Sequence, residues 1–96
     1  MEYTKDFEMK AELLKALAHP VRLCIVSGLL EKEKCNVTAM EQCLAVSQSG
    51  ISQHLSKLKA AGIITSEKIK NEVYYRIKDE ETKQLVIQIL GGLKHG

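Results

Sequence analysis

Apolar residues recur at helical spacing over residues 6–18, with charged residues between them. The inward face of this predicted helix is Met9, Leu13, Ala16 and Leu17. Pro20 ends the helix and suits the first turn of a second one, over residues 20–30. The second helix has two apolar stripes on opposite sides, so we expect it to be central and buried. The stripes are Val21, Cys24, Ile25, Gly28 and Leu29, and opposite them Leu23, Val26 and Leu30.

Two shorter amphipathic segments follow a charged connector at residues 31–34. Asn36 is placed to cap a helix over residues 37–44, whose inward residues are Met40 and Leu44. Ser47 caps a helix over residues 48–61, and Gly62 ends it. The inward face of this fourth helix is Ile51, Leu55 and Leu58, and its polar outer face is Ser49, Gln53, Ser56 and Lys57.

The period of the pattern then changes to two, which predicts strands over residues 63–69 and 73–77. Residues 70–72 form the loop between them, and we expect Asn71 to adopt the positive φ that such turns need. Asp79 caps a last helix, which Gly91 and Gly92 end. Its apolar face is Leu85, Val86, Ile89, Leu90 and Leu93. The predicted fold is mainly α with a small β-hairpin, in the order α-α-α-α-β-β-α of a winged helix-turn-helix.

The composition is that of one small globular domain. The chain has 96 residues, of which 45% are hydrophobic and 27% charged, which excludes a disordered tail. No apolar run approaches the roughly 18 residues of a membrane span, and the charged N-terminus predicts no secretory leader. A core of this size leaves little room for a catalytic cleft. No nucleophile lies at a recognisable spacing from a base, and there is no phosphate-binding glycine loop, so we expect no enzyme.

Positive charge is concentrated in one third of the chain. The net charge is only +2, but residues 47–78 hold six basic and two acidic side chains. The rest of the chain has more acidic than basic residues. Charge alone favours a solvated basic face, so a polyanion partner needs further support.

That support comes from the N-terminal half of the fourth helix. A helix in the major groove needs short polar side chains near its N-terminus, groups that read base edges, and nearby cations for phosphates. Gln53 has the geometry to bond an adenine, Ser49 and Ser52 reach bases or phosphates, and Gly50 permits close approach. The cations for phosphates are Lys57, Lys68 and Lys70. A plain polar surface helix is the alternative.

Four segments together resemble the ArsR/SmtB family of bacterial transcriptional repressors. They are residues 18–23 (AHPVRL), 46–55 (VSQSGISQHL), 58–64 (LKAAGII) and 74–77 (YYRI), and the resemblance covers residues 9–90. It implies a cytoplasmic homodimer, paired through its first and last helices, that binds an imperfect palindromic DNA operator and is released by an inducer. Within the single domain of residues 1–96, the helix-turn-helix covers 36–62 and the wing 63–78.

The resemblance also places individual DNA contacts. Gln48, Ser49, Ser52, Gln53 and His54 match the DNA-reading helix, and residues 68–72, with Lys68, Lys70 and Asn71, match the wing tip. Many members have Gly and Arg where this chain has Asn71 and Glu72. His54 could instead pack beside Leu55, and His19 is expected to bond a backbone group.

Dimerisation has some support from the residues themselves. The last helix has five large apolar residues, more than a peripheral helix of so small a fold needs. In a monomer, part of that surface would be exposed to water. The alternative is that all five cover the chain's own core.

Metal-sensing relatives resemble one another in a Cys-x-Cys pair, and this chain has Asn36 and Thr38 at those positions. The last helix offers only Asp79 and His95, at its opposite ends. We therefore expect no metal and no other cofactor.

Three cysteines remain as candidate thiol sensors: Cys24, Cys35 and Cys43. Two of them could form a redox or persulfide switch, or all three an arsenite site. Relatives with a thiol switch pair a cysteine of the second helix with one in the last helix, which has none here. Alternatively, Cys24 and Cys43 are small core residues and Cys35, in a polar connector, is the most exposed of the three.

A different class of function competes with DNA binding. Winged helices also serve as protein-interaction modules without DNA-binding activity, because the fold alone does not settle the function. Such a module would bind through an apolar patch, and its affinity would not depend on salt.

Overall fold

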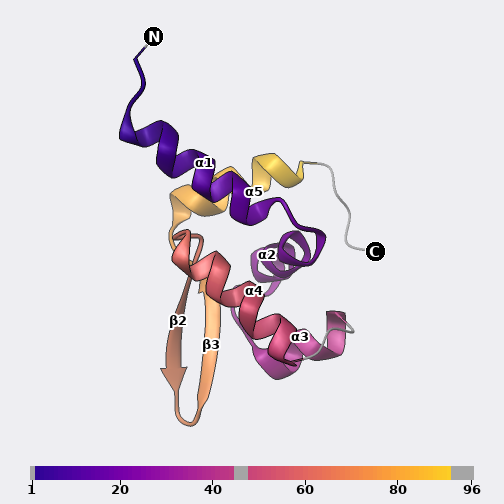
Figure 1. The fold of residues 1–96 in the computed structure, drawn as a ribbon. Helices are drawn as coiled ribbons and strands as arrows, with labels where there is room; N and C mark the ends of the chain where they lie inside the picture. Colours follow the sequence, from indigo (N-terminus) through magenta and orange to yellow (C-terminus); the bar gives the residue numbers. More distant parts are fainter. Residues whose placement is uncertain (1, 45–47, 92–96) are drawn as a thin grey trace.

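The computed structural model describes residues 2–44 and 48–91, without the side chains of residues 43, 48 and 49. In these ranges it has five helices and a three-stranded antiparallel sheet (Figure 1). The elements are α1 (Lys5–Leu17), α2 (Pro20–Lys32), β1 (Cys35–Asn36), α3 (Val37–Leu44), α4 (Gln48–Ala60), β2 (Ile64–Ile69), β3 (Glu72–Ile77) and α5 (Glu80–Leu90). The predicted winged helix-turn-helix order is confirmed, with β1 as an addition.

Helix α2 is the centre of the molecule, as its two apolar stripes predict. It packs against all four other helices and against β3. Ile25, Val26 and Leu29 are at most 3% exposed. The helix ends at Lys32, so half of the predicted charged connector is helical. Glu33 follows with a φ of 67°, a left-handed conformation that is unusual for a residue with a side chain.

Helix α1 is anchored only at its C-terminal end. Ala16 and Leu17 are buried there, whereas Met9, which the pattern places on the inward face, is 67% exposed. That prediction is wrong because the N-terminal half of α1 extends beyond the body of the protein, as Figure 1 shows. No single helix in the described ranges is long and apolar enough to cross a membrane; α1 and α2 reach that length only together, across a 98° bend.

The sheet has the order β1-β3-β2, and both pairings are antiparallel. Strand β1 pairs Cys35 with Tyr75 and was not predicted, because two residues are too few to show an alternating pattern. Strands β2 and β3 pair from Ile64 opposite Ile77 to Ile69 opposite Glu72. The hairpin turn is therefore two residues long, and its left-handed residue is Lys70, at φ 58°, and not Asn71 as expected.

A Schellman motif joins α4 to the hairpin. Gly62 has a φ of 78°, its N–H donates to the carbonyl of Lys59, and the N–H of Ile63 donates to the carbonyl of Leu58. Ile63 and Leu58 are both fully buried. The direction in which the hairpin leaves α4 is therefore fixed by this backbone turn and by the core beneath it.

Two of the predicted helix caps are confirmed. The side-chain oxygen of Asn36 accepts a hydrogen bond from the N–H of Ala39 at 2.9 Å, and that of Asp79 accepts one from Thr82 at 2.8 Å. The bond to Thr82 lowers the pKa of Asp79, because it stabilises the charged carboxylate. The predicted cap at Ser47 lies outside the described residues.

Candidate nucleic-acid interface

Helix α4 has one buried and one exposed face, and the exposed face carries short polar groups and a cation. Ile51, Leu55 and Leu58 are at most 2% exposed and hold the helix against the core. The exposed side chains on the other face are Ser52, Gln53, Ser56 and Lys57. Figure 1 shows α4 crossing the front of the molecule beside the hairpin, with no other element in front of it. The predicted contacts at Gln48 and Ser49 are outside the described side chains.

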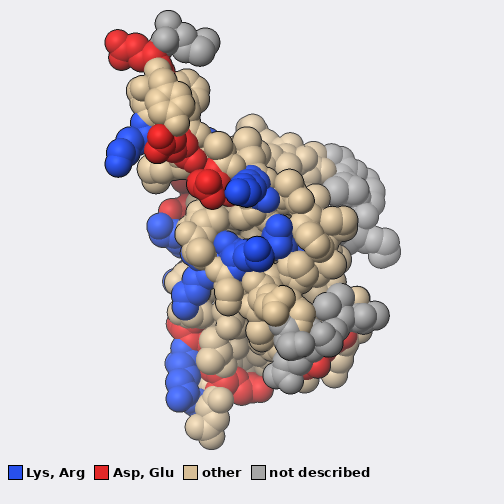
Figure 2. All heavy atoms as spheres, viewed as in Figure 1, with Lys and Arg blue, Asp and Glu red and all other residues tan. Residues whose placement is uncertain are grey.

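The hairpin adds a second exposed cationic element. It projects away from the helices (Figure 1), and Lys68, Lys70 and Asn71 are exposed near or in its turn. Figure 2 shows lysine and arginine side chains over the middle of the same face, where α4 crosses, and down the edge of the hairpin. A polyanion on this face would meet α4 and the hairpin together.

One hydrogen bond connects α4 to strand β2 of the hairpin. The ammonium of Lys59, near the end of α4, donates to the hydroxyl of Ser66 on β2 at 2.8 Å. Lys59, which the sequence pattern counts only as positive charge, therefore joins α4 to the hairpin.

Glu72 is held on the side of the hairpin that faces β1. Its carboxylate accepts hydrogen bonds from the amide of Asn36 at 3.3 Å and from the hydroxyl of Tyr74 at 3.0 Å. These bonds hold the carboxylate in one position. The hydrogen bond to Glu72, followed by the charge of that carboxylate, raises the pKa of Tyr74. The ammonium of Lys34 lies 5.6 Å from the centre of the Tyr74 ring, on the same cluster.

His54 lies at a junction of α1, α2 and α4. It is half-buried, its ring centroid is 4.5 Å from that of His19, and its Nδ1 lies 3.2 Å from Nη1 of Arg22. Arg22 also donates from Nε to the carbonyl of Ala16. Burial, followed by the charges of His19, Arg22 and Lys57, lowers the pKa of His54, so the neutral ring accepts from Arg22 at neutral pH.

His19 has the backbone role that the sequence suggests. Its Nδ1 accepts a hydrogen bond from the N–H of Val21 at 3.1 Å and so caps α2. That prediction is confirmed.

A cationic hollow beside α4 escaped the sequence analysis. Its volume is about 340 Å³, and Lys15, Arg22, Lys57 and Glu12 are among the residues that line it. Three cations and one carboxylate thus lie around one depression, next to the exposed face of α4. The charge pattern of the sequence did not indicate this cluster, because Lys15 and Arg22 precede the basic segment of residues 47–78.

Comparisons with known proteins agree with this geometry. Residues 17–67 match the sequence model of a helix-turn-helix domain. The transcriptional repressor PagR of Bacillus anthracis is 38% identical over 84% of this chain and 81% of its own. The chain belongs to the ArsR/SmtB family.

Another relative and two solved structures extend the likeness. The repressor SmtB of Mycobacterium tuberculosis is 46% identical over 79% of this chain, and the chain spans 56% of that relative's length. The solved structure of HlyU from Vibrio cholerae superposes with a TM-score of 0.84 at 31% identity, over 92% of this chain and 95% of that one. The crystal structure of PagR has a TM-score of 0.80 at 35% identity, over 88% and 97% of the two chains.

The cysteines are not placed as the sequence predicts for this ArsR/SmtB protein. Cys24 is exposed, whereas Cys35 is half-buried and packs against the core. The prediction that Cys35 is the most exposed thiol is wrong, because β1 pairs with β3 and holds it inward. The expectation that Cys24 is a core residue is also wrong, since α2 turns Ile25 and Val26 inward instead. The side chain of Cys43 lies outside the description.

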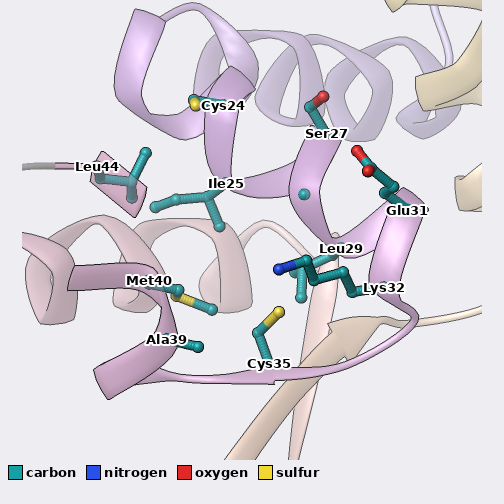
Figure 3. A pocket seen from close by; sticks show the side chains of 11 residues that line it. Cys24, Ile25, Ser27, Leu29, Glu31, Lys32, Cys35, Ala39, Met40 and Leu44 are labelled. Atoms are coloured by element: carbon teal, nitrogen blue, oxygen red, sulfur yellow. The ribbon is translucent and has the colours of Figure 1, made fainter. Parts of the chain in front are cut away.

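Cys24 and Cys35 line one pocket but are not joined in a disulfide. Figure 3 shows them on opposite sides of this pocket, with Ile25 between them. Among the described side chains, no group of three or more His, Cys, Asp or Glu residues is placed to hold a metal ion.

A second exposed surface is apolar. On α1, Phe7 is 51% and Leu14 53% exposed, and these residues are seven positions apart, on one side of the helix. On α5, Ile87 and Ile89 are 42% and 41% exposed, and since they are two positions apart they lie on different sides of that helix. Figure 1 shows α1 and α5 at the same end of the molecule, away from the hairpin tip.

Proposed function

We propose that this protein is a transcriptional repressor that binds double-stranded DNA as a homodimer. The observation that carries the proposal is the single face on which the exposed polar side of α4 and the cationic hairpin lie together. The repressors SmtB and PagR among its relatives support it. In this proposal residues 36–62 are the helix-turn-helix, residues 63–78 are the wing, and the operator is an imperfect palindrome in chromosomal DNA of the cytoplasm.

Base reading is assigned to the exposed face of α4. The Gln53 amide can donate to and accept from an adenine edge, and Ser52 is short enough to let the helix approach. By position on the same helix, Gln48 and Ser49 join this set. Residue types of this kind discriminate between bases because a wrong base leaves a donor or acceptor unpaired.

Phosphate binding is assigned to the exposed cations. Lys57 is on α4 beside the cationic hollow, and Lys68 and Lys70 are on the wing, where Asn71 accompanies them. Each neutralised phosphate releases counterions, so affinity falls steeply as salt rises. His54 is assigned a positioning role, because it already bonds Arg22 and its ring contacts that of His19 at a tilt of 51°.

The homodimer is assigned to the apolar surface of α1 and α5. Phe7, Leu14, Ile87 and Ile89 expose large apolar area that the monomer leaves in water. Self-association would bury part of this area and would present two copies of α4 to the two halves of a palindrome.

The test is a DNA titration of the reduced protein by fluorescence anisotropy. The probes are the DNA upstream of its own gene and a random duplex of equal length, from about 50 to about 200 mM salt. We expect the upstream DNA to bind at least about a thousandfold more tightly. Lys57→Gln should reduce the slope of log K against log salt by about 1, and Lys5→Gln, an exposed lysine on α1, should not.

An alternative result would change the assignment. If the reduced protein binds neither duplex at the lowest salt, the repressor proposal fails and a protein-interaction module takes its place. Equal affinity for both duplexes would contradict sequence-specific repression while leaving DNA binding in place.

A further inference from the structure

A pocket of about 420 Å³ lies between α2, β1 and α3 (Figure 3), and none of its lining residues is on α4 or the hairpin. Its wall is mostly apolar and rich in sulfur. The main lining side chains are Cys24, Ile25, Leu29, Cys35, Met40 and Leu44. A volume of this size lies within the range of pockets that enclose small organic molecules.

Gly28 forms part of the pocket wall, and no packing within the chain requires a glycine there. It lies inside α2, where glycine costs about 0.5–1 kcal/mol relative to alanine. A Cβ built on Gly28 meets nothing within 4 Å, and its φ is not in the left-handed range. The glycine therefore keeps space open in a helix that would be more stable with a side chain at this position.

The lining chemistry selects an uncharged occupant. Among the described residues, no buried side-chain nitrogen or oxygen lacks a hydrogen-bond partner, and the charged side chains of the pocket wall are exposed to water. A charged ligand would meet one like and one opposite charge in the wall and would lose hydration against its apolar remainder. The two charged residues of the wall, Glu31 and Lys32, have opposite signs. Polarisable sulfur atoms instead suit apolar and aromatic contacts.

A second copy of the chain is a poor occupant. The strongly exposed apolar side chains of the helices are on α1 and α5, and none of them lines this pocket. The lining residues are on α2, β1, α3 and the segments beside them, and none is on α1 or α5, the helices proposed to pair.

We propose that this pocket binds a small, uncharged, largely apolar organic molecule, and that its occupancy changes DNA affinity. The second half rests on the proposed function. Met40 and Leu44 bring α3 into the pocket wall, and α3 packs against α4. A ligand that shifts α3 therefore shifts the support of the recognition helix.

The first experiment titrates the full chain with N-phenyl-1-naphthylamine, an uncharged apolar fluorophore, and follows its emission. We expect saturation at one probe per chain. Gly28→Leu, which fills the pocket, should weaken binding by at least about tenfold. The matched control Gly28→Ala leaves most of the space open and should bind as wild type does. Unchanged probe binding by folded Gly28→Leu, checked by circular dichroism, would overturn the proposal.

A second measurement does not depend on Gly28→Leu folding. In a variant with Cys24→Ser and Cys43→Ser, Cys35 is the remaining thiol. Saturating fluorophore should slow its alkylation by N-ethylmaleimide at least about fivefold, because the probe covers the wall that Cys35 lines. An unchanged rate would show that the probe binds elsewhere and would overturn the site.

The third measurement separates the two proposals. Saturating fluorophore should change the affinity for the upstream DNA by at least about fivefold, the lower end of allosteric coupling. Unchanged affinity at full occupancy would overturn the regulatory half. If the probe-free protein fails to bind DNA, the proposed function fails, whereas the fluorophore titration still decides whether the pocket binds the probe.

Sedimentation velocity tests the remaining occupant, a second copy of the chain. A monomer for Gly28→Leu beside a dimer for wild type would assign the pocket to that second copy and overturn the proposal.

Discussion

The surface of α4 and the hairpin and the surface of α1 and α5 belong to one small fold but are built differently. On α4 the large apolar side chains Ile51, Leu55 and Leu58 are fully inside, and serines, a glutamine and a lysine cover the outer face. On α1 and α5 the helices bury only part of their apolar residues, and Phe7 and Leu14 remain about half exposed. On the first surface the large apolar side chains of α4 are buried, whereas on the second some large apolar side chains remain in water, where we propose that a second copy binds.

The contrast separates two ways in which a surface can be specific. The α4 surface depends on where polar groups are held, so it needs rigid support from Gly62, Lys59 and the junction at His54. The proposed pairing through α1 and α5 would depend on removing apolar area from water, which is less directional. Substitutions on α1 and α5 should therefore change the dimer dissociation constant, whereas substitutions on α4 should change DNA affinity and specificity.

The largest expected effect is on the apolar surface. Leu14→Glu would bury a charge at the proposed dimer contact and should raise the dimer dissociation constant at least about a hundredfold, or about 2.8 kcal/mol. The monomer should remain folded because Leu14 is 53% exposed. Sedimentation velocity measures the change. Val73→Glu, at the exposed apolar residue of the hairpin, is the control and should leave the dimer intact. A Leu14→Glu dimer of wild-type affinity would move the interface elsewhere.

The next effect is on base reading. Gln53→Ala should weaken binding to the specific DNA by about 1–3 kcal/mol and relax specificity at one position, because an adenine edge loses its partner. Anisotropy on specific and random duplexes measures it. Ser56→Ala, on the same exposed face but farther from the helix N-terminus, should change specificity less. Equal losses on both duplexes would contradict a base-reading role for Gln53.

The third prediction concerns the backbone: the same substitution, glycine to alanine, should change the free energy of unfolding in opposite directions at two positions. Gly62→Ala should destabilise the protein by about 1 kcal/mol, because alanine is strained at the φ of 78°. Gly28→Ala should stabilise it by about 0.5–1 kcal/mol, because the site is helical and open. Urea denaturation gives both values. If Gly62→Ala were as stable as wild type, the turn would not fix the hairpin direction.

The smallest effect is a pH dependence at the junction beneath α4. Burial lowers the pKa of His54 below its ordinary 6.5, so the unfolded chain binds this proton more readily than the folded protein does. The stabilising contribution is complete above pH 6.5 and is lost as the pH falls from there through the lowered pKa. His54→Asn should lose less stability than wild type between pH about 7.5 and about 5.5 in urea titrations. Parallel curves would contradict the assignment.

The sequence predicts the parts of the fold that have strong periodicity or clear caps. Helix α2, the α4 core face, the hairpin and the caps at Asn36 and Asp79 all follow from local rules. Strand β1 and the left-handed Lys70 do not, because pairing with a distant strand decides the first and the two-residue turn decides the second. The cationic hollow and the sulfur-lined pocket could not be predicted either, because each is formed by residues from several elements that only the tertiary fold brings together.

Asn36 carries a consequence for how such a protein can change over evolutionary time. One side chain caps α3 through its oxygen and reaches Glu72 of the wing through its nitrogen. A hairpin grafted from a relative without an acceptor at position 72 would lose this link to the helix-turn-helix. The exchangeable unit is therefore the wing together with the segment that begins α3, and new operator preferences should be inherited as that combined block.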